Sequence, residues 1–405
     1  MSKLKELIDR LCPDGVEYKS LKSIAIIKNG KDYKHCATGD IPVYGSGGIM
    51  TYIDQSTYNQ PTVLLPRKGS IGKIYYVDTP FWNVDTVYYT DINLDIIIPK
   101  FLYYFLTTVD LEKMNCGKGA VPSLTQEILY RIKIPIPPLE VQEDIVRILD
   151  KFDSYAAELQ AELQARKEQY EYYRNLLLSF NPSACGCGTD GKQEMKDITT
   201  WGGHSYKINW KTMENIFEMR NGYTPSKNNP DFWEGGTIPW FRMEDIRDFG
   251  RILSDSYQHI TPKAIKGKGL FEKNSFILAT TATIGEHAML IADSLANQQF
   301  TNLKVRKSLI DKLVPKFIYY YMFIVDEFCK NNTNVSGFAS VDMGKLKKMP
   351  FPIPPIELQN KIVSILDRFE TLVNDLTQGL PAEIAAVKEQ YEYYRNKLLT
   401  FKQIA

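Results

Sequence analysis

The sequence is poor in the residues that metal sites and disulfide frameworks require. Four histidines and six cysteines occur among 405 residues. We expect reduced thiols, because the cysteines are too scattered for a disulfide framework in a chain this long: they stand at positions 12, 36, 116, 185, 187 and 329. A structural zinc needs about four ligands, and only His204 lies near the Cys185 and Cys187 pair in the sequence. No metal is therefore expected.

The sequence also lacks long apolar runs. No stretch approaches the ~20 apolar residues that cross a membrane, and the first ten residues lack the apolar core of a signal peptide. We therefore expect a cytoplasmic protein with no membrane partner. Hydrophobic residues at 44% and charged residues at 24% are ordinary for a globular protein. The length allows two or three domains, each with its own core.

Catalytic motifs are missing as well. Asp14, Glu17 and Lys19 superficially resemble a metal-dependent nuclease site, but such carboxylates come from separate strands that converge on a cation. Two intervening residues leave no room for that arrangement. An adenine methyltransferase would need a glycine-rich cofactor loop and an Asn/Asp-Pro-Pro-Tyr/Phe tetrapeptide, whereas the Pro-Pro pairs here follow Ile136 and Ile353. We therefore expect that the chain is not an enzyme.

The main feature that is present is an internal repeat. Residues 135–152, which begin Pro-Ile-Pro-Pro-Leu-Glu-Val-Gln, return at 352–369 with an offset of 217. Residues 167–175 (Lys-Glu-Gln-Tyr-Glu-Tyr-Tyr-Arg-Asn) recur unchanged at 388–396 with an offset of 221. Nine identical residues in a row exclude a chance match. The offsets differ by 221 − 217 = 4, so the second copy holds four extra residues between the two motifs.

Weaker matches connect the segments that precede these repeats. They include Asn29-Gly30 with Asn221-Gly222, Gly39-Asp-Ile-Pro42 with Gly236-Thr-Ile-Pro239, and Ile71-Gly72 with Ile284-Gly285. We expect globular domains at 1–138 and 204–355, helices at 139–180 and 356–401, and a glycine-rich polar linker at 181–203. Constant helices beside diverged domains indicate one shared frame that serves two different targets.

Each globular part is predicted to be α+β, a mixed β-sheet with helices. Short β-branched and aromatic runs alternate with glycine-rich turns in both parts. One clear helix is expected in each, near 99–108 and 315–328. Proline fixes φ and lacks a donor, so the Pro-Ile-Pro-Pro runs cannot be helical, and the long helices begin after Pro138 and Pro355.

The helix after Pro138 has the pattern of a coiled-coil seam. From Phe152 to Phe180 its apolar and aromatic residues alternate steps of four and three. About 40 residues at ~1.5 Å each give a rod of roughly 60 Å, and its apolar stripe needs a partner. The second copy supplies one, so two long coiled-coil helices are expected to separate the domains. Near Gly379 and Pro381 one step of three becomes four, which indicates a local break.

The net charge of the whole chain is +1, but positive and negative charges are distributed unevenly along the sequence. Residues 200–356 carry 20 Lys and Arg against 15 Asp and Glu, a net charge of +5. Residues 141–180 carry 5 against 8, a net charge of −3. Basic domains and acidic helices fit a nucleic-acid partner without demanding one.

Polar glycine-rich loops are the candidate contacts to nucleic acid. Hydroxyls, arginines and lysines on a turn suit phosphates and base edges, although a solvated hairpin turn has the same composition. The candidates in the first domain are Arg67, Lys68, Ser70, Lys73 and Lys118. Those in the second are Arg220, Tyr223, Thr224, Ser226, Lys227, Arg242, Thr280, Thr281 and Thr283, with Asn334 and Ser336 in a later loop.

The tyrosines of the repeated helices have two interpretations. Amphipathic tyrosines fill a narrow helix–helix core and keep their hydroxyls at its rim. Tyr172 and Tyr393 lie off the seam, however, and are also candidates for contact with a partner protein.

Together these patterns resemble the specificity subunit of type I restriction–modification systems. The resemblance rests on two diverged domains, each followed by Pro-Ile-Pro-Pro-(Leu/Ile)-Glu-(Val/Leu)-Gln, then Ile-Leu-Asp-(Lys/Arg)-Phe, then the nine-residue motif, and it covers essentially the whole chain. Cys12-Pro-Asp-Gly-Val-Glu-Tyr18 and Gly236-Thr-Ile-Pro-Trp240 also look like this family. Residues 157–160 and 161–164, both Ala-Glu-Leu-Gln, look like the tandem repeat of one subgroup.

The resemblance implies two target recognition domains, each of which reads one half of a bipartite site in double-stranded DNA. The two helices would pack antiparallel and bind the methyltransferase subunits, which carry S-adenosylmethionine. A restriction and translocase subunit would add ATP and magnesium, so no cofactor is expected in this chain. The residues expected to bind partner subunits are Gln142, Tyr172, Arg174, Gln359, Tyr393 and Arg395. The DNA sequence that is read does not carry over.

Two alternatives stay open on the residues alone. One is a catalytic methyltransferase or nuclease with fused recognition domains, against which the missing motifs argue. The other is a coiled-coil scaffold that binds only proteins, which the divergence of the two domains disfavours.

Overall fold

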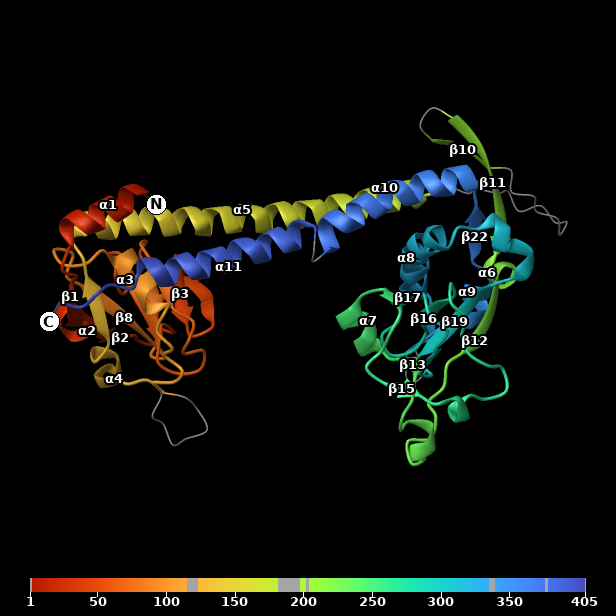
Figure 1. The fold of residues 1–405 in the computed structure, drawn as a ribbon, viewed down its shortest axis with the longest axis horizontal. Coiled ribbons are helices and arrows are strands. Elements are labelled where there is room, and N and C mark those ends of the chain that lie inside the picture. Colours follow the sequence, from red (N-terminus) through yellow and green to blue (C-terminus); the bar gives the residue numbers. More distant parts are fainter. Residues whose placement is uncertain are drawn as a thin grey trace. The chain divides into compact units, whose positions relative to one another are not determined.

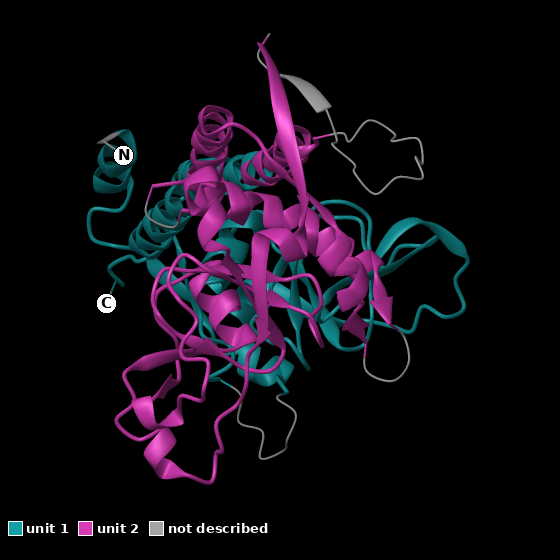
Figure 2. Cartoon of the chain, turned by 90° about the vertical axis from the view of Figure 1, so that its right-hand side faces the viewer, with its two compact units in different colours: residues 1–162, 380–405 teal, residues 163–379 magenta. Residues whose placement is uncertain are grey.

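The computed structural model describes residues 2–114, 123–180, 197–201, 204–334, 339–375 and 378–404 (Figure 1). The chain divides into two compact units, residues 1–162 with 380–405 and residues 163–379 (Figure 2). Each unit therefore combines one globular domain with helical segments from both copies of the repeat. Most of the expected linker at 181–203, together with Cys116, Cys185 and Cys187, lies outside the described residues.

The domain of the first unit is built on a sheet with the strand order β2-β8-β5-β6. Shorter sheets have the orders β4-β3-β7 and β1-β9, and α3 packs against β5 and β6. The elements are α1 (Ser2–Leu11), β1 (Glu17–Ser20), α2 (Leu21–Ile24), β2 (Ala25–Asn29), β3 (Thr38–Gly45), β4 (Gly48–Ile53), β5 (Thr62–Pro66), β6 (Tyr75–Val77), β7 (Trp82–Asn83), β8 (Val87–Ile92), α3 (Pro99–Leu106), α4 (Gln126–Tyr130) and β9 (Lys133–Ile136).

The domain of the second unit has the related strand order β12-β19-β16-β17-β14. Other sheets have the orders β15-β13-β18, β10-β11-β22 and β20-β21, and α8 packs against β17 and α10. Its helices are α6 (Met213–Ile216), η1 (Pro230–Phe232), α7 (Met243–Phe249), η2 (Pro262–Ala264), η3 (Lys307–Lys312), α8 (Pro315–Asn331), α9 (Met343–Lys348) and α10 (Ile356–Asn374). Its strands are β10 (Asp197–Trp201), β11 (His204–Thr212), β12 (Phe217–Asn221), β13 (Ile238–Phe241), β14 (Ile252–Leu253), β15 (His259–Ile260), β16 (Phe276–Ala279), β17 (His287–Leu290), β18 (Leu295–Ala296), β19 (Phe300–Val305), β20 (Thr333–Asn334), β21 (Ser340–Val341) and β22 (Pro350–Ile353).

The Asn-Gly matches between the domains have a steric cause. Gly30 follows β2, and a Cβ there would lie 2.1 Å from the carbonyl oxygen of Val84. Gly222 follows β12, and a Cβ there would lie 2.2 Å from the carbonyl oxygen of Asn297. Only glycine allows the two backbone segments to approach this closely. The two domains therefore share this close backbone contact at the matching Asn-Gly positions. The similar sheets and helices confirm the α+β prediction for both domains.

The long helices are α5 (Leu139–Leu178), α10, and α11 (Leu380–Leu398). In the first unit α5 and α11 run antiparallel, as the rings of Phe152 and Tyr394 and the hydrogen bond from Tyr155 to Glu383 show. In the second unit the rings of Tyr170 and Tyr173 pack on Phe369 of α10. The predicted local break near Gly379 falls where α10 has ended and α11 begins. Among the described residues, no helix combines the length and apolarity of a membrane span.

Candidate DNA-binding surfaces

The loop at 67–73 of the first domain follows the fully buried strand β5. The guanidinium of Arg67 lies 5.3 Å from the centre of the Tyr88 ring, and the main chain of Arg67 bonds to Thr86 and Leu124. Lys68 and Ser70 are exposed, whereas Ile71 is buried beneath them. The loop is therefore anchored by Arg67 and Ile71 and presents Lys68 and Ser70 to solvent.

The tip of the β3–β4 hairpin lies beside this loop. Lys73 Nζ donates to the carbonyl of Gly47 at 2.7 Å, and the Tyr75 hydroxyl donates to the carbonyl of Ser46 at 3.1 Å. A Cβ on Gly69 would stand 3.0 Å from Ser46 Oγ. Lys73 thus braces the hairpin tip, a role that sequence reasoning missed. The run Gly45-Ser-Gly-Gly48 was the signal for this tip.

A cavity of about 750 Å³ lies at this hairpin, lined by segments 32–34, 45–50 and 84–86. Ile49 and Met50 on its rim are about half exposed. Lys31, next to the lining, and Lys34, within it, are exposed as well. Asp32 and Asp85 also line this cavity, so the lysines at its edge, and not the cavity itself, suit contacts with phosphates.

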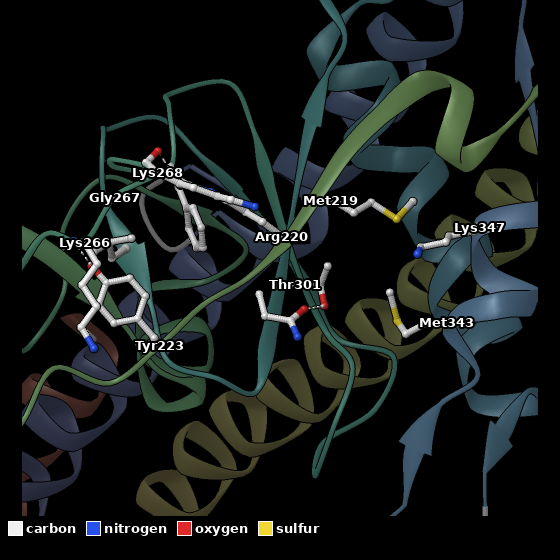
Figure 3. A pocket seen from close by; sticks show the side chains of 12 residues that line it. Met219, Arg220, Tyr223, Lys266, Gly267, Lys268, Thr301, Met343 and Lys347 are labelled. Carbon is white, nitrogen blue, oxygen red and sulfur yellow. Dashed lines mark hydrogen bonds between the residues drawn. The ribbon is translucent and has the colours of Figure 1, made fainter.

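The second domain has a more basic cavity of about 590 Å³ (Figure 3). Lys266 and Lys268 reach it from the loop after η2, and Lys347 reaches it from α9. All three lysines are exposed. Tyr223 and Phe271 supply aromatic walls. Sequence reasoning missed these lysines, although Lys266-Gly-Lys268 and Lys345-Leu-Lys347-Lys348 are visible basic clusters.

Arg220 and Tyr223, both predicted, line this cavity and hold its lysine loop in place. The guanidinium of Arg220 lies 4.7 Å from the centre of the Phe271 ring and donates to the carbonyls of Lys268, at 2.7 Å, and Leu270. Burial lowers the pKa of Arg220. The Tyr223 hydroxyl donates to the carbonyl of Ala264 and accepts from the amide of Lys266 at 2.9 Å.

Other predicted residues of the second domain lie outside the lining of this cavity. The hydroxyl of Thr224 donates to Gln298, and the carbonyl of Ser226 accepts from the Trp233 indole. Arg242 forms an ion pair with Glu244 at 2.6 Å. Lys227 is exposed, Thr281 and Thr283 are half-buried, and Asn334 is exposed in β20. Lys118 and Ser336 lie outside the described residues.

The prediction that Thr280 faces DNA needs a correction. Thr280 is 6% exposed, and its hydroxyl lies 3.0 Å from that of Thr301 on the neighbouring strand. The match of Ile71-Gly72 with Ile284-Gly285 makes Thr280 the counterpart of Arg67, which is half-buried. The two loops start alike, but the threonine side chain turns into the sheet, where a hydroxyl can be satisfied and a guanidinium cannot.

A second correction concerns Gln142 and Gln359, which were expected to bind partners. Both are completely buried. Gln142 accepts from the amide of Ile98 at 2.8 Å and donates to the carbonyls of Ile96 and Pro137. Gln359 makes the equivalent three bonds to Val314, Lys312 and Pro354. Each glutamine fastens the start of its long helix to its own domain, so it has no surface to offer a partner.

The remaining predicted partner residues lie on the helices. Tyr172 and Tyr393 are 64% and 58% exposed. Each packs edge to face on the next tyrosine, with ring centroids 5.4 and 5.2 Å apart. Arg174 and Arg395 are half-buried over the rings of Tyr170 and Tyr391. Among the described residues, no three His, Cys, Asp or Glu side chains gather in a way that could hold a metal ion.

A family model described as the type I restriction modification DNA specificity domain matches residues 13–169 and again residues 207–386. The chain belongs to the family of type I restriction–modification specificity subunits. Specificity subunits are the non-catalytic components of type I complexes. Each matched segment covers one globular domain and part of the helical region that follows it.

One relative of this specificity subunit matches over nearly its whole length, and another matches over about half of it. The EcoR124I/EcoR124II specificity subunit of Escherichia coli is 30% identical over 422 residues, which cover 99% of this chain and 97% of the relative. The EcoprrI specificity subunit, also from Escherichia coli, is 47% identical over 204 residues, which span about half of each chain.

Solved structures show the same fold. A chain from a study of complex assembly and conformational transition of the type I R-M system matches with a TM-score of 0.61 at 16% identity, over 96% of this chain and 98% of that one. The HsdS subunit from Thermoanaerobacter tengcongensis matches with a TM-score of 0.52 at 15% identity, over 96% and 97% of the two chains.

Proposed function

We propose that this specificity subunit reads a bipartite site in double-stranded DNA, one half with each domain. Residues 1–138 and 204–355 are the target recognition domains in this proposal. Residues 139–180 and 356–401 are the spacer helices, and 181–203 is a linker. Because the target is genomic DNA, the chain acts in the cytoplasm.

The observation that carries the proposal is the lysine cavity of the second domain. Lys266, Lys268 and Lys347 come from two separate segments onto one aromatic-walled hollow. Ammonium groups that gather in this way neutralise successive phosphates, and polar groups between them reach base edges. The loop at 67–73 and the β3–β4 hairpin tip, with exposed Lys34 and Lys68, are the corresponding elements of the first domain.

We further propose that the helices bind the methyltransferase subunits. Tyr172 and Tyr393 belong to identical nine-residue motifs and are exposed to a similar degree. Two equal surfaces suit two copies of one partner. In this proposal S-adenosylmethionine is bound by those subunits, and ATP and magnesium by a restriction and translocase subunit.

Salt-dependent DNA binding by the full chain, with its methyltransferase subunits, tests the proposal. Each phosphate contact contributes about 0.9 to the slope of log affinity against log salt for duplex DNA. Changing Lys266, Lys268 and Lys347 together to alanine should weaken binding to every sequence and flatten this slope by up to about 3. Lys211→Ala, an exposed lysine of β11 away from the cavity, is the matched control. Unchanged binding by the triple variant would refute the cavity as a DNA surface, and no DNA binding by the wild type would favour a scaffold that binds only proteins.

A further inference from the structure

A chain of side-chain hydrogen bonds crosses the sheet of the second domain and ends at its basic cavity. Thr280 follows β16, Thr301 lies on β19, and Asn221 is the last residue of β12. The hydroxyls of Thr280 and Thr301 are 3.0 Å apart, and the hydroxyl of Thr301 donates to Asn221 Oδ1 at 3.0 Å. The two threonines are buried, whereas Asn221 is exposed and lines the cavity. Figure 3 shows the bond made by Thr301 at the cavity wall.

The direction of this chain follows from the number of protons. A hydroxyl has one proton to donate, and Thr301 gives its proton to Asn221. Thr301 must then accept from Thr280 at 3.0 Å, which leaves no proton for the longer contact of Thr280 with the Gln299 carbonyl at 3.5 Å. The bonds therefore run from Thr280 through Thr301 to Asn221. Consecutive hydrogen bonds polarise and orient one another. The carbonyl end of the Asn221 amide is therefore occupied, and its NH2 end is the end left for a ligand. Within the described residues, Asn221 Nδ2 has no hydrogen-bond partner.

Burial alone does not require this arrangement, as the first domain shows. Thr62 and Thr90 are fully buried on adjacent strands of the equivalent sheet. Their hydroxyls are satisfied locally, by the carbonyls of Thr90 and Val63. Asn29 is the residue of the first domain that corresponds to Asn221. Its partner on the neighbouring strand is Tyr88, whereas the partner of Asn221 is Thr301. The oriented amide is thus particular to the second domain.

We propose that Asn221 is a specificity-determining residue of the second domain, which reads a hydrogen-bond acceptor on a base edge in the major groove. An amide NH2 can donate to N7 or O6 of guanine, to O4 of thymine and to N7 of adenine. The major-groove edge of cytosine offers a donor, and Asn221 rejects it. Lys266, Lys268 and Lys347 hold the phosphates beside the base, so this assignment rests on the DNA-reading function proposed above.

Two nearly isosteric variants separate this role from a structural one. Asn221→Asp keeps the oxygen that accepts from Thr301 but replaces the NH2 end by a second acceptor. It should move the base preference at one position away from guanine and thymine, which offer only acceptors, and toward cytosine, which offers a donor. Adenine offers both groups and does not distinguish the two side chains. Thr301→Val removes the hydroxyl proton that orients the Asn221 amide, so the amide can rotate. This variant should weaken the preference for one base over another at that same position. A mismatched base pair in a recognition site typically lowers affinity about 5- to 150-fold, and one donor contact of this kind is expected near the lower figure.

Selection from a randomised duplex library, followed by sequencing, measures these preferences with the full chain and its methyltransferase subunits. Thr90→Val is the matched control, because it removes a buried hydroxyl from the other domain and should alter neither half-site. A thermal melt of each variant confirms that it folds.

A change at one position of one half-site supports the proposal. A motif identical to that of the wild type in Asn221→Asp, or a uniform loss across both half-sites, overturns it while the DNA-reading function stands. If the wild type itself enriches no motif, both proposals fall.

Discussion

Phe152 of α5 lies against Tyr394 of α11, with the ring centroids 5.7 Å apart. Phe369 of α10 lies against Tyr173 of α5 at the same distance. The two phenylalanines are equivalent at an offset of 217, and the two tyrosines at an offset of 221. Each unit therefore takes its phenylalanine from one copy of the repeat and its tyrosine from the other. This exchange joins the two copies into one frame.

Phe152→Ala and Phe369→Ala should destabilise the chain to a similar degree. Each removes a half-buried ring and its aromatic contacts, at a cost of about 1–3 kcal/mol in the free energy of unfolding. Thermal unfolding measures the loss. Tyr172→Ala, which truncates an exposed ring, should cost less than about 0.5 kcal/mol. Phenylalanine variants as stable as this control would show that the rings do not hold the helices together.

Gln142→Ala should destabilise the first unit by about 1–3 kcal/mol, because it leaves the buried Pro137 carbonyl and the part-buried Ile98 amide and Ile96 carbonyl without this partner. Gln359→Ala should cost the second unit a similar amount. Urea denaturation provides the free energies, and hydrogen exchange at the Ile98 amide should accelerate in Gln142→Ala. An unaltered exchange rate would contradict the assigned role of the side chain.

The stability of the first unit is expected to depend on pH through Asp153. The Tyr104 hydroxyl faces both Asp153, at 2.7 Å, and Asp150, at 2.6 Å, but has only one proton to donate. Asp153 is exposed over much of its side chain, but desolvation of its carboxyl group and the neighbouring Asp150 raise its pKa, although the bond from Tyr104 opposes them. Because the folded-state pKa is raised, the contribution of Asp153 to stability is fully present below its unfolded-state pKa, which is near 3.9. That contribution is lost as the pH rises through the folded-state pKa.

Asp153→Asn should remove this loss, because an amide stays neutral and can donate to the Tyr104 oxygen. The variant should therefore gain stability over the wild type at pH 7 and gain less at pH 4. Thermal unfolding at the two pH values measures the difference. Glu158→Gln, an exposed carboxylate on the same helix, is the control. A gain that is equal at both pH values would show that the titration of Asp153 is not its source.

A third copy of Ala-Glu-Leu-Gln after residue 164 should lengthen the nonspecific spacer of the DNA site by one base pair, or at most two. Four residues add about 6 Å to a helix and turn it about 40° beyond a full turn, and base pairs stack about 3.4 Å apart. The tandem repeat spans the boundary between the two compact units, at 162 and 163, so neither domain core changes. Methylation-site sequencing in cells measures the spacer. An insertion with serine for leucine, which interrupts the apolar stripe, should instead lower stability. An unchanged spacer at full activity would show that these helices do not set the distance.

Local chemistry made much of the architecture predictable. The Pro-Ile-Pro-Pro runs mark where α5 and α10 begin, because the constraint that proline places on the backbone acts on its own and the preceding residue. The helices near 99 and 315 begin at a proline in the first turn, as expected. The Asn-Gly matches correctly marked equivalent positions, since the requirement for glycine there comes from a close backbone approach.

The sites depended on contacts that the sequence does not display. Lys266 and Lys347 are about eighty residues apart and meet because η2 and α9 flank the same cavity. Gln142 and Thr280 looked like surface residues, since both are polar and stand in or beside motifs.

The sequence by itself determined the repeat, the positions of the long helices and the family, because identity, proline placement and periodicity are properties of neighbouring residues. Only the tertiary structure decided which polar side chains face solvent. It turned Gln142 toward the carbonyls of Ile96 and Pro137 and directed the hydroxyl of Thr280 toward Thr301. A buried polar group must find its partners wherever the fold brings them, and those partners come from distant segments.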